Sequence, residues 1–142
     1  MLDKKKVLLG MSGGVDSSVS ALLLKEKGYE VIGITMQLWC DDKKTVEDAK
    51  KVCDKLGIEH HVVNYKEEFK KYVIDDFINK YLDAKTPNPC IECNRYLKFG
   101  MMWEKAKELG AYYIATGHYA KTCYSEKYKR YVIKKSDSIK KD

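Results

Sequence analysis

The sequence lacks the features that mark several large classes of protein. Its 142 residues contain no apolar run near the roughly 20 positions that a membrane-spanning helix needs. Its first residues lead straight into a short apolar run without the hydrophobic region of a secretion signal, so we expect a cytoplasmic location and no membrane partner. Five cysteines are an odd number, which argues against a disulfide scaffold in such a chain. Internal repeats and low-complexity segments are also missing, so one globular domain is expected.

Proline is scarce too, and Pro87 and Pro89 are the only two. The rest of the chain therefore has no strong helix breaker, and short apolar runs alternate with segments of helical periodicity. Strands are predicted at 5–9, 30–38, 58–64 and 111–116, and helices at 16–27, 45–56, 67–81 and 96–109. This alternation predicts an α/β fold, a Rossmann-like open parallel sheet with helices on both faces, followed by a short β-ribbon within 119–134. In such sheets ligands bind beyond the carboxyl ends of the strands.

The turn after the first strand reads GMSGGVDSS at residues 10–18 and resembles an anion-binding loop without its lysine. Gly13 and Gly14 permit a tight turn and a close approach of backbone amides to a ligand. A Walker-type loop would continue with Gly-Lys-Ser/Thr, whereas Asp16 stands at this helix start. An acid beside a polyphosphate needs a bridging metal, so Asp16 indicates Mg²⁺. The alternative is an ordinary strand–turn–helix junction in which Asp16 caps the helix.

Both prolines fall in a second unusual stretch, TPNPCIECNRYLKFG at residues 86–100. They predict an extended backbone that prevents helix formation until Cys93. A thiol at a helix start, near Arg95 and Lys98, would have a lowered pKa and more thiolate. If the glycine loop activates ATP, as the resemblance described below implies, a reactive cysteine beside it suggests a two-step reaction, in which an oxygen is adenylated and sulfur then displaces AMP.

The net charge of +6 is concentrated at the C-terminal end. Residues 121–142 contain eight Lys or Arg and three Asp or Glu, so they contribute +5 of it. This segment is either a solvated tail or a patch that binds the phosphates of a nucleic acid.

These stretches resemble two known signatures. SGGVDS matches the S-G-G-x-D-S of the PP-loop ATP pyrophosphatases, which cleave ATP between the α- and β-phosphates. TPNPCIECNRYLKF is similar to the T-P-N-P-x-x-x-C-N-x-x-[IL]-K-F of the tRNA-specific 2-thiouridylases, and ATGHY at 115–119 extends the resemblance. That family converts the wobble uridine U34 of tRNA to 2-thiouridine.

The resemblance implies a set of site residues. ATP, with Mg²⁺, would be bound by Gly10, Met11, Ser12, Gly13, Gly14, Val15, Asp16, Ser17, Met36 and Gly117. Cys93 would be the first catalytic cysteine, with Cys90 as its partner. The target base of the tRNA would face Asn88, Pro89 and Cys90, and His118, Lys141 and Asp142 would contact the tRNA elsewhere. Without the resemblance, Met36 could equally be a core residue and His118 a turn residue.

The sequence departs from the family pattern at Cys90, where many members have aspartate. The C-x-x-C spacing fits an iron–sulfur cluster, zinc or a reversible disulfide, with Cys40 or Cys123 as the only further thiol ligands available. Cys53 is expected in the core.

Family members are normally longer. They carry a second catalytic cysteine that receives sulfur from a donor protein, a cysteine desulfurase or a relay protein, and β-rich tRNA-binding domains follow. We therefore expect residues 1–120 to be the ATP-binding and catalytic domain, and 121–142 to be a basic ribbon and tail, of either an N-terminal fragment or a truncated gene product. Complete catalysis is not expected of this chain alone. Two further readings stay open: an amide-forming ligase with the same loop, and a nucleotide-binding module without turnover.

Overall fold

A four-stranded parallel sheet forms the centre of the computed structural model, which describes residues 1–39 and 43–134. Its strands are β1 (Asp3–Gly10), β2 (Glu30–Gln37), β3 (Glu59–Asn64) and β4 (Ala111–Ala115). The strand order is β3-β2-β1-β4, and each neighbouring pair is parallel. The chain therefore reverses its direction of winding across the sheet at β1, between β2 and β4. This is the switch point beside which open α/β sheets bind ligands.

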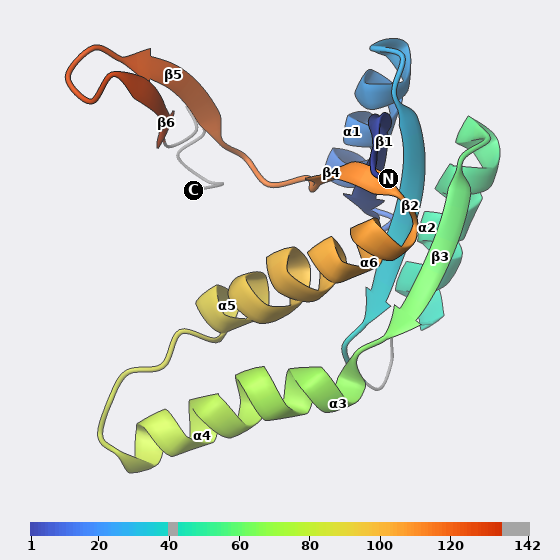
Figure 1. The fold of residues 1–142 in the computed structure, drawn as a ribbon. Helices are drawn as coiled ribbons and strands as arrows, with labels where there is room; N and C mark the ends of the chain where they lie inside the picture. The colour runs from blue at the N-terminus through green and yellow to red at the C-terminus, as the bar shows by residue number, and fades with distance from the viewer. Residues whose placement is uncertain (40–42, 135–142) are drawn as a thin grey trace.

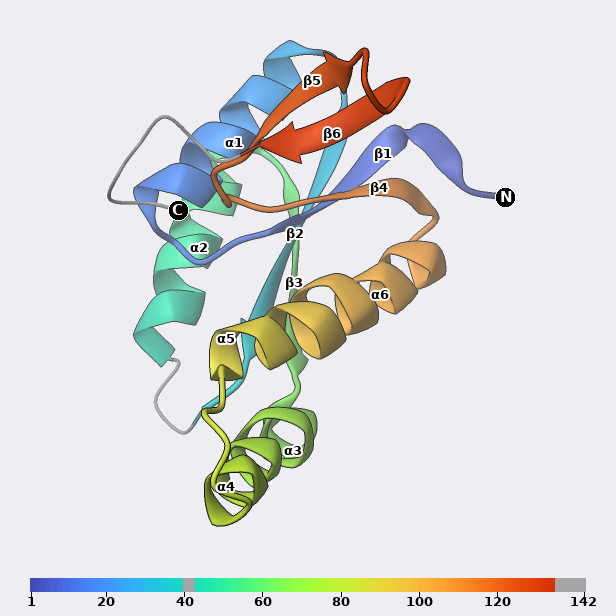
Figure 2. The same ribbon diagram turned by 90° about the vertical axis from the view of Figure 1, so that its left-hand side faces the viewer.

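Helices cover both faces of the sheet, as the sequence predicts (Figure 2). On one face lie α1 (Val15–Glu26) and α2 (Lys43–Leu56), which bury Ala21, Ala49 and Cys53 against Leu9 and Val31. The other face packs against α6 (Met102–Glu108), where Met102 and Ala106 contact Leu8, Ile32 and Ile34. The predicted core position of Cys53 is confirmed, since its side chain is fully buried.

A pair of helical segments extends away from the sheet (Figure 1). The first is a continuous run of α3 (Lys66–Phe69), the π-helical segment η1 (Lys70–Ile74) and α4 (Asp75–Leu82). The second is α5 (Pro89–Glu92), which runs into the π-helical η2 (Cys93–Met101) and then into α6. Val73 of η1 packs against Cys93 and Leu97 of η2, and this small core joins the two.

The prediction that the prolines delay this helix until Cys93 is wrong, because α5 begins at Pro89. Asn88 has an extended backbone, as a residue before proline prefers, and its Oδ1 accepts a hydrogen bond from the Ile91 N–H at 3.3 Å. Pro89 then occupies the first helical position, where a missing N–H removes no hydrogen bond. Cys90 is therefore in the first turn of the helix, and Cys93 follows one turn later.

The predicted ribbon is confirmed as β5 (Lys121–Ser125) paired antiparallel with β6 (Arg130–Lys134). It stands apart from the sheet, after a linker that follows β4 (Figure 1). Within 1–39 and 43–134, no helix is long and apolar enough to cross a membrane. Cys40, Lys141 and Asp142, which the sequence analysis singled out, lie outside the described residues.

Candidate nucleotide-binding site

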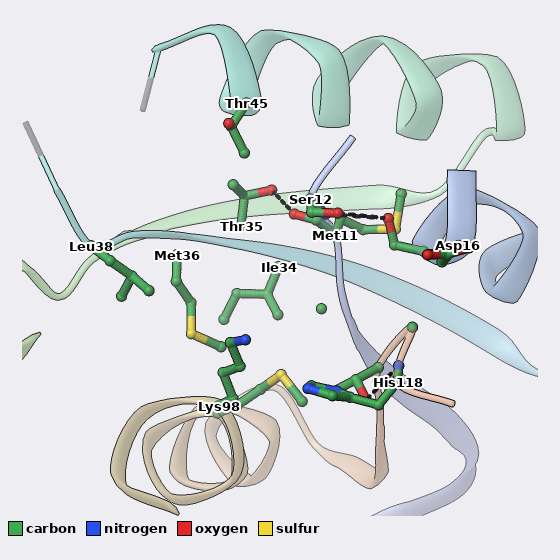
Figure 3. A pocket seen from close by; sticks show the side chains of 15 residues that line it. Met11, Ser12, Asp16, Ile34, Thr35, Met36, Leu38, Thr45, Lys98 and His118 are labelled. Carbon is green, nitrogen blue, oxygen red and sulfur yellow. Dashed lines mark hydrogen bonds between the residues drawn. The ribbon is translucent and has the colours of Figure 1, made fainter. Parts of the chain in front are cut away.

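A cavity of about 330 Å³ lies at the carboxyl ends of β1, β2 and β4 (Figure 3). Most of the residues predicted to bind ATP line it, although they come from three separate parts of the chain: Gly10, Met11, Ser12, Asp16, Ser17, Met36 and Gly117. Gly13, Gly14 and Val15, which were predicted with them, are not part of this wall. The parallel topology explains the convergence, because it brings the loops after these strands to one edge of the sheet.

The loop between β1 and α1 is shaped by Gly13 rather than equally by both glycines. Gly13 has a φ of +73°, and a Cβ there would lie 2.8 Å from the backbone N of Ala49 and from the Cβ of Asp48. Gly14 has an ordinary φ of −82°, and a Cβ there would meet only Ser12 Oγ, at 3.4 Å. Only glycine therefore suits position 13, where the turn packs directly on α2.

Two serine hydroxyls hold this loop against the first turn of α1. The Ser12 N–H donates to Ser17 Oγ at 3.3 Å, and Ser17 Oγ donates to the Gly14 carbonyl oxygen at 3.2 Å. The two hydroxyls are themselves 3.2 Å apart. Because the N-terminus of α1 adds its positive dipole end, this wall of the cavity suits an anion.

Asp16 is not the helix cap, so the alternative reading of this residue is wrong. The N-cap of α1 is Gly14, and Asp16 lies in the first turn behind it. The Asp16 carboxylate accepts a hydrogen bond from the Tyr119 hydroxyl at 2.7 Å. Carboxylate and hydroxyl oxygens at Asp16, Ser12 and Ser17 are the hard ligands that suit Mg²⁺, and they surround one end of the cavity.

Gly117 allows the loop after β4 to close on this wall. A Cβ at this position would lie 3.1 Å from the backbone N of Ser17 and 3.2 Å from the Cβ of Asp16. The approach explains why the chain has glycine here. It also explains how Tyr119, far away in sequence, reaches Asp16.

The opposite wall carries Lys98, a cation that was predicted only to lower the pKa of the Cys93 thiol. Lys98 comes from η2 and points into the cavity beside Met36, across from Ser12 (Figure 3). In the part of the chain that the structure describes, no carboxylate forms an ion pair with it within 4 Å. A lysine from another helix therefore faces the loop that itself has none. The signal in the sequence that could have found it is its place in the signature around Cys93, where Lys98 is the lysine of the closing K-F.

The remainder of the wall is largely apolar. Ile34, Met36 and Leu38 of the β2 end face Met102 of α6, and Thr45 of α2 completes this side. The cavity thus has a polar end at the glycine loop and an apolar end that fits a flat organic ring. Leu38, Thr45 and Thr116 were not predicted as site residues. Nothing in the sequence pattern distinguishes Leu38 and Thr45, whereas Thr116 belongs to the ATGHY motif.

His118 lies at the cavity edge as a neutral residue. Its Nδ1 is 2.7 Å from Thr116 Oγ1, and its ring centroid is 5.8 Å from that of Phe99. Burial, and secondarily the charge of Lys98, lowers the pKa of His118 below its usual 6.5. His118 at neutral pH is therefore a hydrogen-bonding group rather than a cation.

The two cysteines of the C-x-x-C motif differ from their predicted environments. Cys93 is buried between η1 and η2, and burial raises the pKa of its thiol, although Lys98 acts in the opposite direction. The expected lowering of its pKa is therefore wrong, because Cys93 is not at the helix start. Cys90 is exposed. Neither thiol lines the cavity, and no disulfide joins them.

The residues that the structure describes do not complete a metal–sulfur site. Across 1–39 and 43–134, no three His, Cys, Asp or Glu side chains gather as a metal site would require. Cys90 and Cys93 supply two thiols where an iron–sulfur cluster needs more ligands.

The fold and the glycine loop together define an α/β domain of the PP-loop ATP pyrophosphatase type. The NH3-dependent NAD synthetase from Campylobacter jejuni shares this fold, with a TM-score of 0.56 and 22% identity over 78% of this chain and 46% of that one. The chain belongs to the family of the tRNA methyl transferase HUP domain, whose model matches residues 5–142.

Individual relatives confirm the resemblance seen in the sequence. The tRNA-specific 2-thiouridylase MnmA of Clostridium botulinum (strain Eklund 17B / Type B) is 56% identical, over 99% of this chain and 42% of that protein. The chain thus spans less than half the length of the curated relatives that it matches. A solved structure of the U34-tRNA thiolase NcsA from Methanococcus maripaludis, with its [4Fe-4S] cluster, is 29% identical with a TM-score of 0.53, over 82% of this chain and 40% of that one.

Proposed function

We propose that this chain is the ATP-binding part of a tRNA uridine 2-sulfurtransferase that makes 2-thiouridine at the wobble position. One observation carries the proposal: Lys98 and the Ser12–Asp16–Ser17 wall face each other across a single cavity. A cation opposite an anion-binding loop fits a triphosphate, and the apolar end fits adenine. The 56% identity to a tRNA-specific 2-thiouridylase supports the choice of substrate.

The proposed chemistry has two steps. The C2 oxygen of uridine attacks the α-phosphorus of ATP, the bond from that phosphorus to the β-phosphate oxygen breaks, and pyrophosphate leaves. The N3 proton of uridine is lost in this step. A persulfide on one of the two cysteines is then attacked at its inner sulfur by the thiolate of the other, so that a Cys90–Cys93 disulfide forms and hydrosulfide leaves. Hydrosulfide attacks C2, AMP leaves with the original oxygen, and an external thiol reduces the disulfide.

Lys98 and the loop amides stabilise the charge that develops on the phosphates. Asp16, with the hydroxyls of Ser12 and Ser17, would hold Mg²⁺, which would supply further neutralisation of that charge.

In this proposal Cys93 and Cys90 handle sulfur, and Asn88, Pro89 and Cys90 lie near the target base. Asn88 also has a structural role, because its side chain caps the N-terminus of α5. Because Cys93 is only 8% exposed, sulfur transfer there requires η2 to move from η1. A sulfur donor protein, a desulfurase or a relay protein, would reload the thiol. His118, the ribbon and the tail with Lys141 and Asp142 would contact tRNA.

The first experiment measures Mg·ATP binding by calorimetry. Lys98→Gln should weaken binding by about tenfold or more, because a charged hydrogen bond contributes roughly 1.5–3 kcal/mol. Lys107→Gln is the matched control, since Lys107 pairs with Glu104 outside the cavity. Equal affinity in Lys98→Gln and the wild type would contradict this assignment of the cavity.

A second experiment separates the remaining functions by pyrophosphate release from ATP. Release that requires unmodified tRNA supports the thiolation proposal. Release with ammonia and a carboxylic acid in place of tRNA would indicate an amide-forming ligase. ATP binding with no release under either condition would leave this chain as a nucleotide-binding module.

A further inference from the structure

Thr35 is a polar side chain buried in the cavity wall (Figure 3), with two short hydrogen bonds. It is 2% exposed and comes from the β2 strand. Its Oγ1 donates to the carbonyl oxygen of Met11 at 2.7 Å and lies 2.8 Å from Nε2 of His60 on β3. His60 is not part of the cavity wall. The three groups form a chain that runs from the third strand of the sheet to the glycine loop.

The protons in this chain have only one arrangement. A hydroxyl has a single hydrogen, and the Met11 carbonyl oxygen can only accept it. Thr35 Oγ1 must therefore accept from His60, which requires the proton of His60 to be on Nε2. Burial lowers the pKa of His60 below 6.5, so the neutral Nε2–H tautomer is the form expected at neutral pH.

The carbonyl that Thr35 holds belongs to the first peptide of the loop. The Met11 carbonyl and the Ser12 N–H lie in one rigid peptide plane, so a bond to one fixes the direction of both. That Ser12 N–H donates to Ser17 Oγ, and the Met11 N–H donates to the Ile34 carbonyl oxygen at 2.8 Å. The entry to the loop is thus fixed from the β2 side by Thr35 and Ile34.

We propose that His60 is a positioning residue for the nucleotide loop, which it orients through Thr35 and the Met11–Ser12 peptide. The inference rests on the proposed function in that the loop is taken to bind ATP. His60 contacts no substrate. It acts by keeping the Thr35 hydrogen directed at the Met11 carbonyl, which presets the Ser12 amide before a ligand arrives.

The test compares variants that keep or remove each donor. His60→Leu removes the donor to Thr35, and we expect Mg·ATP to bind about three- to tenfold more weakly, as for the loss of one hydrogen bond. His60→Gln keeps an N–H donor and should restore most of the affinity. Thr35→Val should weaken binding as His60→Leu does, and Thr35→Ser should rescue it. His61→Gln is the matched control, because His61 bonds instead to Glu59 at 2.7 Å.

Nitrogen NMR of the wild type and of His60→Leu supplies two further readouts. The tautomer tests the hydrogen bond to Thr35, and the Ser12 amide resonance tests its effect on the loop. The proposal requires the Nε2–H tautomer of His60 and a shifted Ser12 amide resonance in His60→Leu. An Nδ1–H tautomer overturns it, and so does a folded His60→Leu that binds ATP within twofold of the wild type. If the wild type binds no ATP, the proposed function fails. The tautomer of His60 and the Ser12 amide resonance still show whether His60 orients the Met11–Ser12 peptide through Thr35.

Discussion

Single residues with special geometry shape the candidate site. Gly13 has a positive φ and packs on α2, whereas the neighbouring Gly14 has an ordinary backbone. Gly117 allows the loop after β4 to contact α1, and Lys98 supplies a cation that the loop itself lacks. The two glycines contribute by allowing a close backbone approach, and Lys98 contributes by placing its charge in the cavity. Adjacent glycines that look equivalent in the sequence therefore should not respond alike to substitution.

Gly13→Ala should lower the free energy of unfolding by about 2 kcal/mol or more, because alanine disfavours positive φ and its Cβ would overlap α2. Gly14→Ala is the control and should change it by less than about 1 kcal/mol. Urea titrations followed by circular dichroism measure both. A larger loss in Gly14→Ala than in Gly13→Ala would contradict the loop geometry.

At the scale of elements, the helix that starts at Pro89 decides the environment of the two cysteines. Cys90 is exposed in its first turn, and Cys93 faces η1 one turn later. The start of this helix is also tied to α4, since Lys80 Nζ lies 2.9 Å from Glu92 and 2.8 Å from Asp76. The helix pair therefore keeps one thiol accessible and the other covered.

Iodoacetamide should alkylate Cys90 before Cys93 in the native protein. At pH 8 the buried Cys93, with its raised pKa, should react more slowly by about an order of magnitude or more. Tryptic mass spectrometry after short exposures measures the two rates. Cys90→Ser and Cys93→Ser serve as controls that each leave one thiol of this pair, and unfolding in urea should equalise the rates of Cys90 and Cys93. Faster modification of Cys93 in the folded chain would disprove the observed packing of η2 on η1.

For the whole molecule, the charged ribbon stands apart from the α/β domain (Figure 1). Residues 121–134 carry five cations and one acid, Glu126. Tyr128 at the turn is flanked by Lys127 and Arg130, whose charges lie 5.1 Å and 6.0 Å from its ring centroid. Tyr131 is 75% exposed. Cations beside exposed aromatic rings suit RNA, which offers phosphates and bases to stack.

Affinity for tRNA should fall by about 10- to 100-fold between 50 and 200 mM salt, as expected when about two to four phosphates are neutralised. Lys127→Gln with Arg130→Gln should flatten this slope, whereas Lys50→Gln with Lys55→Gln on α2 should leave it unchanged. Filter binding at several salt concentrations measures it. If the affinity of the wild type does not change with salt concentration, the charges of the ribbon are only solvated and do not bind phosphates.

The sequence by itself determined the strands, most of the helices and the position of the candidate site, but not the start of the helix at Pro89. Apolar periodicity is a local property, so β1 to β4 and the ribbon could be predicted within a few residues. The carboxyl-end rule for parallel strands then located the cavity at the loops after β1, β2 and β4.

Only the tertiary structure decided which side chains share that cavity and which are covered. Lys98 and Cys93 lie on one helix, and the packing of η2 against η1 and the sheet sends the first into the cavity and buries the second. Sequence spacing places residues on a helix face but does not say which neighbour covers that face. The His60–Thr35–Met11 chain was hidden for the same reason, since its three groups meet only when β1, β2 and β3 lie side by side.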